Sequence, residues 1–196
     1  MSTVKAAAFN HPSASSGGLA ISATGLVTGG GLDPVQPASV AYTGTSATIT
    51  GNRVDFTAVS SLSLNGVFTS AYTDYAFFFR AIGSTVATQV RIRMRLAGTD
   101  ATTANHDGGY TASLTSAQTE LTVAVVSSAR YGMSALTVYA PAVAIETGWS
   151  GTGYRSDNDL LLIAGRQGNA TAYDGFTLNV SSGTFTGSVS IYGYHS

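Results

Sequence analysis

The sequence of 196 residues has no cysteine, few charged residues and only four prolines. Without cysteine the chain cannot form a disulfide, a thiolate zinc site or a cysteine nucleophile. Lysine and glutamate, which usually solvate the outer face of helices, occur only as Lys5, Glu120 and Glu146. No apolar stretch reaches the roughly 18 residues that a membrane-spanning helix needs. The sequence therefore predicts neither a helical protein nor insertion into a membrane.

The charge balance also excludes one class of partner. Nine Lys and Arg stand against ten Asp and Glu, which gives a formal net charge of -1. Proteins that bind nucleic acid or an anionic membrane carry a basic patch or a basic excess. We therefore expect no nucleic-acid partner.

Small residues dominate what is present. The chain holds 28 Ala, 26 Thr, 24 Ser and 23 Gly, together 101 of 196 residues. Threonine favours a pleated, half-buried surface, whereas serine and glycine favour turns over helices. Hydrophobic residues make up 44% of the chain, which is enough for a packed core. The composition predicts an all-β protein, and the strand pattern described below favours an antiparallel β-sandwich resembling a jelly roll.

Two regions differ in character. Residues 1–50 contain three of the four prolines, the glycine run at 29–31 and only two aromatic residues. They predict a short, irregular N-terminal arm with short strands at best, such as residues 19–27, or alternatively a disordered tail. Residues 51–196 predict the head domain, because short alternating runs there are separated by Gly, Ser, Asn or Asp.

The strands of the head are expected at regular intervals. Turns are predicted at Asn65–Gly66, at Gly108–Gly109, at Asp174–Gly175 and at residues 181–184. Eight to ten short strands separated by turn residues are typical of a sandwich or jelly roll. The predicted strands are residues 54–56, 60–64, 75–82, 89–96, 121–126, 135–139, 142–145, 160–164, 176–180 and 187–192.

A line of arginines is the first candidate site. Residues 89–96 alternate between apolar side chains and Arg91, Arg93 and Arg95, so the three guanidinium groups share one face of a strand. Arginine forks match phosphate or carboxylate groups, and the line could therefore contact an anionic surface polymer. A solvated strand face, or pairing with Asp residues across a subunit interface, is the alternative interpretation.

The second candidate site is the segment 149–159. It holds the only tryptophan and several side chains suited to sugars, which stack on aromatic rings and bind carboxylate, amide and guanidinium groups. A glycan contact and an ordinary surface loop are both open. A calcium site on Asp157, Asn158 and Asp159 is not expected, because the glycine and distal glutamate of an EF-hand loop are missing. The candidate contact residues are Trp149, Tyr154, Arg155, Asp157, Asn158 and Asp159.

The sequence contains little evidence for catalysis or metal binding. His106 precedes the Gly108–Gly109 turn and is expected to be a loop residue, and the three histidines lack close metal-ligand spacing. Glu120 and Glu146 lie in no recognisable motif, although glycosidases need two carboxylates at a fixed separation. No nucleophile elbow or phosphate-binding loop occurs. We expect no enzyme, no catalytic residues, no metal and no cofactor; a polysaccharide-degrading enzyme remains the weaker alternative.

The last 24 residues carry a resemblance to a known group of proteins. They read Tyr-Asp-Gly-Phe at 173–176, Ser-Gly-Thr-Phe-Thr-Gly at 182–187 and Ile-Tyr-Gly-Tyr at 191–194. This order resembles the C-terminal signature of bacteriophage tail-fibre, minor tail and receptor-binding head domains. The segment 67–75 followed by a hydrophobic strand and by Val-Arg-Ile-Arg-Met-Arg-Leu at 90–96 is similar to them as well. The resemblance covers roughly residues 54–196.

The resemblance implies a structural virion protein, a minor tail or receptor-binding protein that contacts the host cell surface. It implies a homotrimer, with the N-terminal arm attached to other virion proteins and with host glycan as a possible ligand. The chain departs from a long fibre because no heptads or shaft precede the head, so a capsid decoration or head-fibre protein is the alternative. Residues 1–9 do not form a secretory signal, and we expect synthesis in the bacterial cytoplasm and assembly into the virion.

Overall fold

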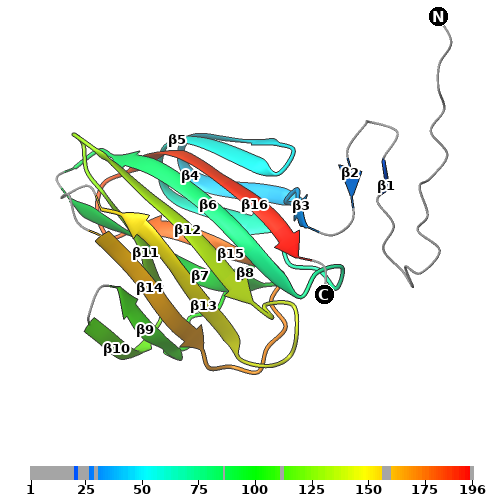
Figure 1. The fold of residues 1–196 in the computed structure, drawn as a ribbon. Helices are drawn as coiled ribbons and strands as arrows, with labels where there is room; N and C mark the ends of the chain where they lie inside the picture. Colours follow the sequence, from blue (N-terminus) through cyan, green and yellow to red (C-terminus); the bar gives the residue numbers. More distant parts are fainter. Residues whose placement is uncertain are drawn as a thin grey trace, which may run out of the picture.

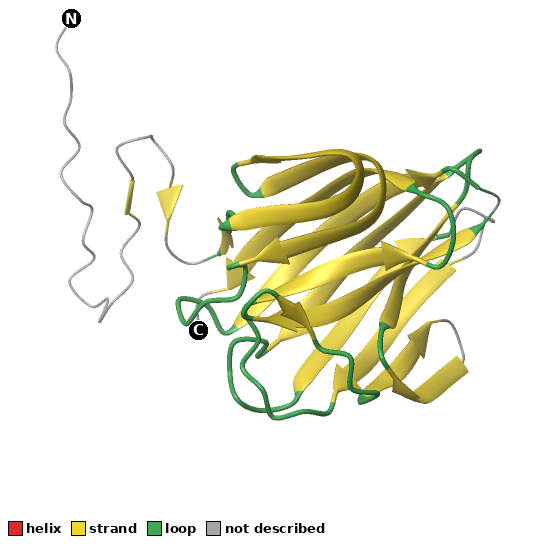
Figure 2. Ribbon diagram, turned by 180° about the vertical axis from the view of Figure 1, so that it is seen from behind, coloured by secondary structure: helices red, strands yellow, loops and turns green. Residues whose placement is uncertain are grey.

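A computed structural model describes residues 20–21, 27–28, 31–85, 87–110, 113–155 and 160–194. These residues form β-strands and loops, with no helix among them, which confirms the all-β prediction (Figures 1 and 2). The strands are β1 (Ala20–Ile21), β2 (Val27–Thr28), β3 (Leu32–Pro34), β4 (Ser39–Thr50), β5 (Arg53–Asn65), β6 (Asp74–Gly83), β7 (Thr88–Leu96), β8 (Thr99–Asp100), β9 (His106–Tyr110), β10 (Ser113–Gln118), β11 (Leu121–Val126), β12 (Tyr131–Tyr139), β13 (Thr147–Tyr154), β14 (Leu160–Gln167), β15 (Gly175–Val180) and β16 (Phe185–Tyr194).

Fourteen of these strands belong to one antiparallel sheet, and β1 pairs only with β2. The main strand order is β10-β9-β14-β13-β12-β6-β16-β5-β15-β7-β11, so β10 and β11 lie at opposite ends of the path. Two residues, Thr119 and Glu120, connect them along the chain. Because a residue spans at most about 3.6 Å, the sheet must curl until its two ends meet.

Strand β5 forms the bend between the two halves of the sheet. Its first part pairs with β16, from Arg53↔Ser190 to Val59↔Phe185, and its second part pairs with β15. Near the end of the first part, where the register shifts between Phe56 and Val59, Ala58 has a φ of 47°, a left-handed conformation that is uncommon for alanine. One half of the sheet then contains β16, β6, β12, β13 and β14, and the other contains β15, β7 and β11; Figure 1 shows the second half behind the first.

The core lies between these two halves. Phe77 of β6 stacks on Phe176 of β15 with ring centroids 4.7 Å apart, and Phe68 packs against both rings. Phe185 of β16 makes an edge contact with Phe56 of β5 at 4.9 Å. The facing halves are compatible with the predicted sandwich, but the jelly-roll arrangement stays a prediction.

The main sheet begins earlier in the chain than the predicted boundary near residue 50. Residues 39–50 form β4, which pairs with the whole length of β5, so the predicted boundary near residue 50 falls at the turn of a hairpin. β3 pairs with the end of β16, from Tyr192↔Pro34 to Tyr194↔Leu32. The sheet therefore includes residues from Leu32 onward. The rest of the predicted arm lies outside the described residues, apart from β1, β2 and Gly31.

Most predicted strands of the head are confirmed, but residues 54–56 and 60–64, predicted as two strands, form the single strand β5. Three other predictions need correction. Residues 142–145 form turns and bends instead of a strand, and Gly108–Gly109 lie inside β9 instead of in a turn. Gly175 begins β15 without a positive φ; glycine is required there because a Cβ atom would lie 2.1 Å from the carbonyl oxygen of Leu64. The expected left-handed glycines at Gly66 and Gly183 are present, with φ of 62° and 70°.

Candidate functional site

The segment predicted to contact glycan is divided by the structure. Trp149 lies inside β13 with only 3% of its surface exposed, so its ring offers no face to a sugar, and the prediction is wrong for this residue. Tyr154 ends β13 as an exposed residue, and Arg155 follows it as a half-buried one. The remaining candidates, residues 157–159, lie outside the described part of the chain. The structure therefore brings only Tyr154 and Arg155 together near one end of β13.

The glycines around Trp149 explain this error. They suggest a loop in the sequence, but in β13 they let neighbouring strands approach closely. A Cβ atom on Gly151 would lie 2.4 Å from the carbonyl oxygen of Ala135, and one on Gly153 would lie 2.2 Å from that of Met133. β13 is thus a regular central strand between β12 and β14, and its alternation turns Trp149 inward.

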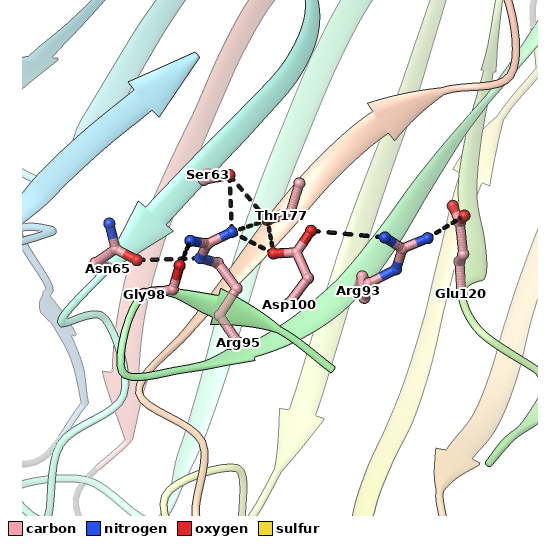
Figure 3. A network of polar contacts seen from close by, with 8 residues as sticks. All are labelled: Ser63, Asn65, Arg93, Arg95, Gly98, Asp100, Glu120 and Thr177. Atoms are coloured by element: carbon pink, nitrogen blue, oxygen red, sulfur yellow. Dashed lines mark hydrogen bonds and ion pairs between the residues drawn. The ribbon is translucent and has the colours of Figure 1, made fainter. Parts of the chain in front are cut away.

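The arginine line belongs to the polar face, the outer surface of the half that contains β5, β15 and β7 (Figure 3). The guanidinium group of Arg95 is the centre of the network, and this residue is only 9% exposed. Its Nε donates to Asn65 Oδ1 at 3.0 Å, and its Nη1 donates to Ser63 Oγ at 3.0 Å and to Thr177 Oγ1 at 2.8 Å. It also donates to the carboxylate of Asp100 and to the carbonyl oxygen of Gly98.

The neighbouring Arg93 extends this network. Its Nη2 lies 2.5 Å from Glu120 Oε1, and its Nη1 lies 3.6 Å from Asp100 Oδ2. Arg91 donates to Gln89 Oε1 at 3.0 Å. The guanidinium groups of Arg93 and Arg95 therefore bind carboxylate and hydroxyl groups of the same chain, whereas Arg91 contacts Gln89 two residues away on its own strand; a contact with an anionic polymer or with Asp of another subunit stays a prediction. The polar face comprises Arg91 and the side chains drawn in Figure 3, which are Ser63, Asn65, Arg93, Arg95, Asp100, Glu120 and Thr177.

His106 is another correction. It was expected in a loop, but it begins β9 and is 1% exposed. Burial lowers the pKa of the imidazole, the backbone of Gln118 raises it less strongly, and the charge of Arg93 lowers it further. The register places His106 beside Gln167 of β14, and Gln167 beside Thr147 of β13, so three polar residues cross the inner side of the sheet. His106 is therefore held neutral in a buried position.

The outer surface of the other half has the opposite chemistry. Side chains on paired residues of adjacent antiparallel strands point to the same side of a sheet. One row runs from Leu160 through Tyr154 and Met133 to Arg80, and the next runs from Leu162 through Thr152 and Ala135 to Phe78. We call this surface the apolar face. Its large exposed side chains are Phe78, Tyr131, Met133, Tyr139, Tyr154, Leu160, Leu162 and Tyr194, each 37–60% exposed.

The apolar face is hollowed where its side chains are small. A hollow of about 540 Å³ has Ala76, Ala135 and Thr152 in its floor and Leu162 and Tyr194 among its walls. A second hollow of about 310 Å³ lies beside it, against Met133 and Tyr154. Phe78 lines both hollows and makes an edge contact with Tyr192, with ring centroids 5.7 Å apart. Protruding rings and shallow depressions therefore alternate on one surface.

The charges near this face lie at its borders or are already occupied. Arg53 pairs with Asp55 at 2.5 Å on β5, two strands away from β6. At the opposite border Arg166 pairs with Glu146 at 3.0 Å and with Asp107 at 3.2 Å. Within the face, the guanidinium carbon of Arg80 lies 4.1 Å from the ring centre of Tyr131, a cation–π contact.

Sequence reasoning did not identify the apolar face, although a signal for it exists. Residues 75–79 read Tyr-Ala-Phe-Phe-Phe and residues 160–163 read Leu-Leu-Leu-Ile, so neither run alternates. A continuous apolar run is typical of a strand covered on both sides. Phe78 and Leu162 are exposed instead, which shows that one side of these strands is covered by nothing within the described chain.

The described residues contain no group of three or more His, Asp or Glu placed to hold a metal ion. No helix in this part of the chain is both long enough and apolar enough to cross a membrane. A scan against protein-family models finds no match for the sequence, and a search of curated proteins finds none either.

Proposed function

We propose that this protein is a structural component of a bacteriophage virion, a minor tail or receptor-binding protein whose β-rich head contacts the host cell surface. The observation that carries the proposal is the C-terminal signature. Residues 175–194 of that signature supply β15 and β16, and β16 lies between β5 and β6 in the middle of the sheet. The resemblance therefore involves strands on which the whole head is built, in addition to its surface.

The role proposed is one of recognition and assembly, without catalysis. The two glutamates are engaged in ion pairs, Glu120 with Arg93 and Glu146 with Arg166. Asp107 also pairs with Arg166, and the pKa of its carboxyl is lowered, first by a hydrogen bond from the backbone of Ala117. A general acid in a glycosidase needs the opposite shift, because it must hold a proton near neutral pH.

The proposed partners follow from the same resemblance. The protein would assemble as a homotrimer within the virion, with its N-terminal arm attached to other tail proteins. Tyr154 and Arg155 are the described candidates for a glycan contact, at the end of β13 next to the segment 156–159. A capsid decoration or head-fibre protein, anchored by the same arm, is the alternative function.

The position of the chain in the intact particle tests this proposal. Antibodies raised against the purified protein and marked with gold would be applied to particles of the phage that encodes it. We expect gold at the tail, with antibody pre-absorbed on the purified protein as the control. Gold on the capsid would support the alternative, and purified particles that lack the protein would refute a virion role.

A further inference from the structure

The apolar face has a size that an isolated soluble domain rarely exposes. Its eight large side chains are 37–60% exposed. With about 200 Å² for each large side chain, they present roughly 700 Å² of mainly apolar surface. The largest apolar patch of a typical monomer is about 300–600 Å², and a standard interface buries about 800 Å² on each partner. The area therefore matches one side of a stable protein interface.

The distribution of charge indicates the kind of partner. Interfaces between copies of one chain have an apolar centre and a polar rim. Here the rows from Leu160 to Arg80 and from Leu162 to Phe78 lie between the Arg53–Asp55 pair and the Arg166–Glu146 pair. Arg80, the cation within the face, already lies over the ring of Tyr131. The face therefore favours a partner with little charge, because an acidic or basic partner would gain no electrostatic attraction there.

The chain itself meets this description. Only 10% of its residues are charged and its net charge is -1. The face also carries both elements of a complementary fit, because the exposed ring of Phe78 stands beside hollows floored by Ala135 and Thr152. A second copy can place its projecting side chains over these depressions, since sheets pack face to face through interdigitated side chains.

We propose that the apolar face is the surface through which this protein binds a second copy of itself. The inference goes beyond the trimer implied by the resemblance, because it names the contact surface. It does not depend on the virion role, because it stands on the area, charge and shape of the face. Assembly through this face leaves the polar face free of the interface, since the two belong to different halves of the sheet. It would cover Tyr154, so that Arg155 is the described glycan candidate that is not part of the face.

The first test compares two matched variants of the full chain. Leu162→Lys puts a charge into the centre of the apolar face, and Leu96→Lys makes the same change at an equally exposed leucine of β7; the two side chains are 49% and 46% exposed. Light scattering after size exclusion should give the wild type and Leu96→Lys at least twice the single-chain mass of 19.9 kDa. Leu162→Lys should weaken self-association by about 100-fold or more, because the ammonium group loses its water in the interface.

The second test locates the contact by thiol labelling, since the chain has no cysteine of its own. Thr152→Cys places one thiol on the apolar face, and Thr99→Cys places one on β8; both positions are exposed. A maleimide should label Thr152→Cys slowly in the assembled protein and rapidly once Leu162→Lys is added. Thr99→Cys should be labelled rapidly in both backgrounds.

Three outcomes would overturn the proposal. The wild type could remain a single chain at micromolar concentration; slow labelling of Thr152→Cys in such a single chain would mean that another segment of the same chain covers the face. The protein could assemble while Thr152→Cys is labelled at full speed, which would place the contact on another surface. Leu162→Lys could assemble like Leu96→Lys. Fluorescence of the buried Trp149 would verify that each variant is folded.

Discussion

The two outer faces of the curled sheet differ in how far their side chains find partners within one copy of the chain. The polar face consists of charged and hydroxyl side chains, and its central cation, Arg95, is satisfied by five partners of the same chain. The apolar face consists of rings and aliphatic side chains, and its leucines and Phe78 stay exposed. A side chain such as Arg95 is stabilised inside one copy, whereas the described residues of the same copy leave Leu162 49% exposed.

This difference shows that exposure does not follow charge in this protein. A row of arginines suggests a binding site, but the guanidinium groups of Arg93 and Arg95 are occupied by Asp100, Glu120 and neighbouring hydroxyls. The apolar face contains no conspicuous motif, yet it has the area and rim of an interface. Two of the following predictions test whether the polar face contributes to the stability of the single chain and the apolar face does not, and another concerns His106 on the inner side of the sheet.

The largest effect is expected from Arg95→Met. The change removes the nearer cation from the carboxylate of Asp100, which is half-buried with 24% of its side chain exposed, and leaves buried hydroxyl groups without their donor, and we expect it to cost about 3 kcal/mol of unfolding free energy. Asp100 retains a second, longer contact with Arg93, and Thr177 and Ser63 each lose a hydrogen bond. Urea denaturation followed by the fluorescence of Trp149 would measure the change.

Arg53→Met is the matched control for this prediction. Arg53 also pairs with an aspartate, but the two side chains are 56% and 47% exposed. Exposed ion pairs contribute only about 0–1 kcal/mol, so the control should unfold at nearly the wild-type urea concentration. Equal losses in both variants would show that the polar face does not stabilise the chain through its burial.

The sequence predicts the strands of this fold better than its surfaces. Alternation in residues 89–96 correctly places Val90, Ile92 and Met94 in the core, because a period of two is a local property. Burial of Arg95 depends on Ser63 and Thr177, which lie 32 and 82 residues away and which no local pattern connects. The site prediction failed at Trp149 for the same reason, since strand pairing across glycines is a tertiary property.

A smaller effect is expected from acidification, and it should act through His106. Burial lowers the pKa of this imidazole in the folded chain below its value in the unfolded chain. The unfolded chain therefore binds the proton more readily, and stability that is fully present above about pH 6.5 declines as the pH falls below that value. The loss from His106 between pH 7 and pH 5.5 is limited by the slope for one titrating group, which is at most about 1.4 kcal/mol per pH unit.

His106→Gln is the control for the pH effect, because glutamine does not titrate. The groups that act on His106 are Arg93, Glu120 and Asp107, together with the backbone of Gln118. Urea midpoints would be compared for both proteins across this pH range. An unchanged pH slope in His106→Gln would assign the loss of stability to the carboxylates of the polar face instead.

The smallest effect is expected on the apolar face itself, once assembly is removed. In the background of Leu162→Lys, Met133→Thr should change the unfolding free energy by less than about 0.5 kcal/mol, as exposed substitutions usually do. Leu136→Ala in the same strand and background should cost about 3 kcal/mol, because Leu136 is buried on the inner side. Urea midpoints of the three proteins would measure both changes. A loss at Met133 as large as that at Leu136 would mean that the face belongs to the core of the single chain, and that its large side chains need no second copy to hold them in place.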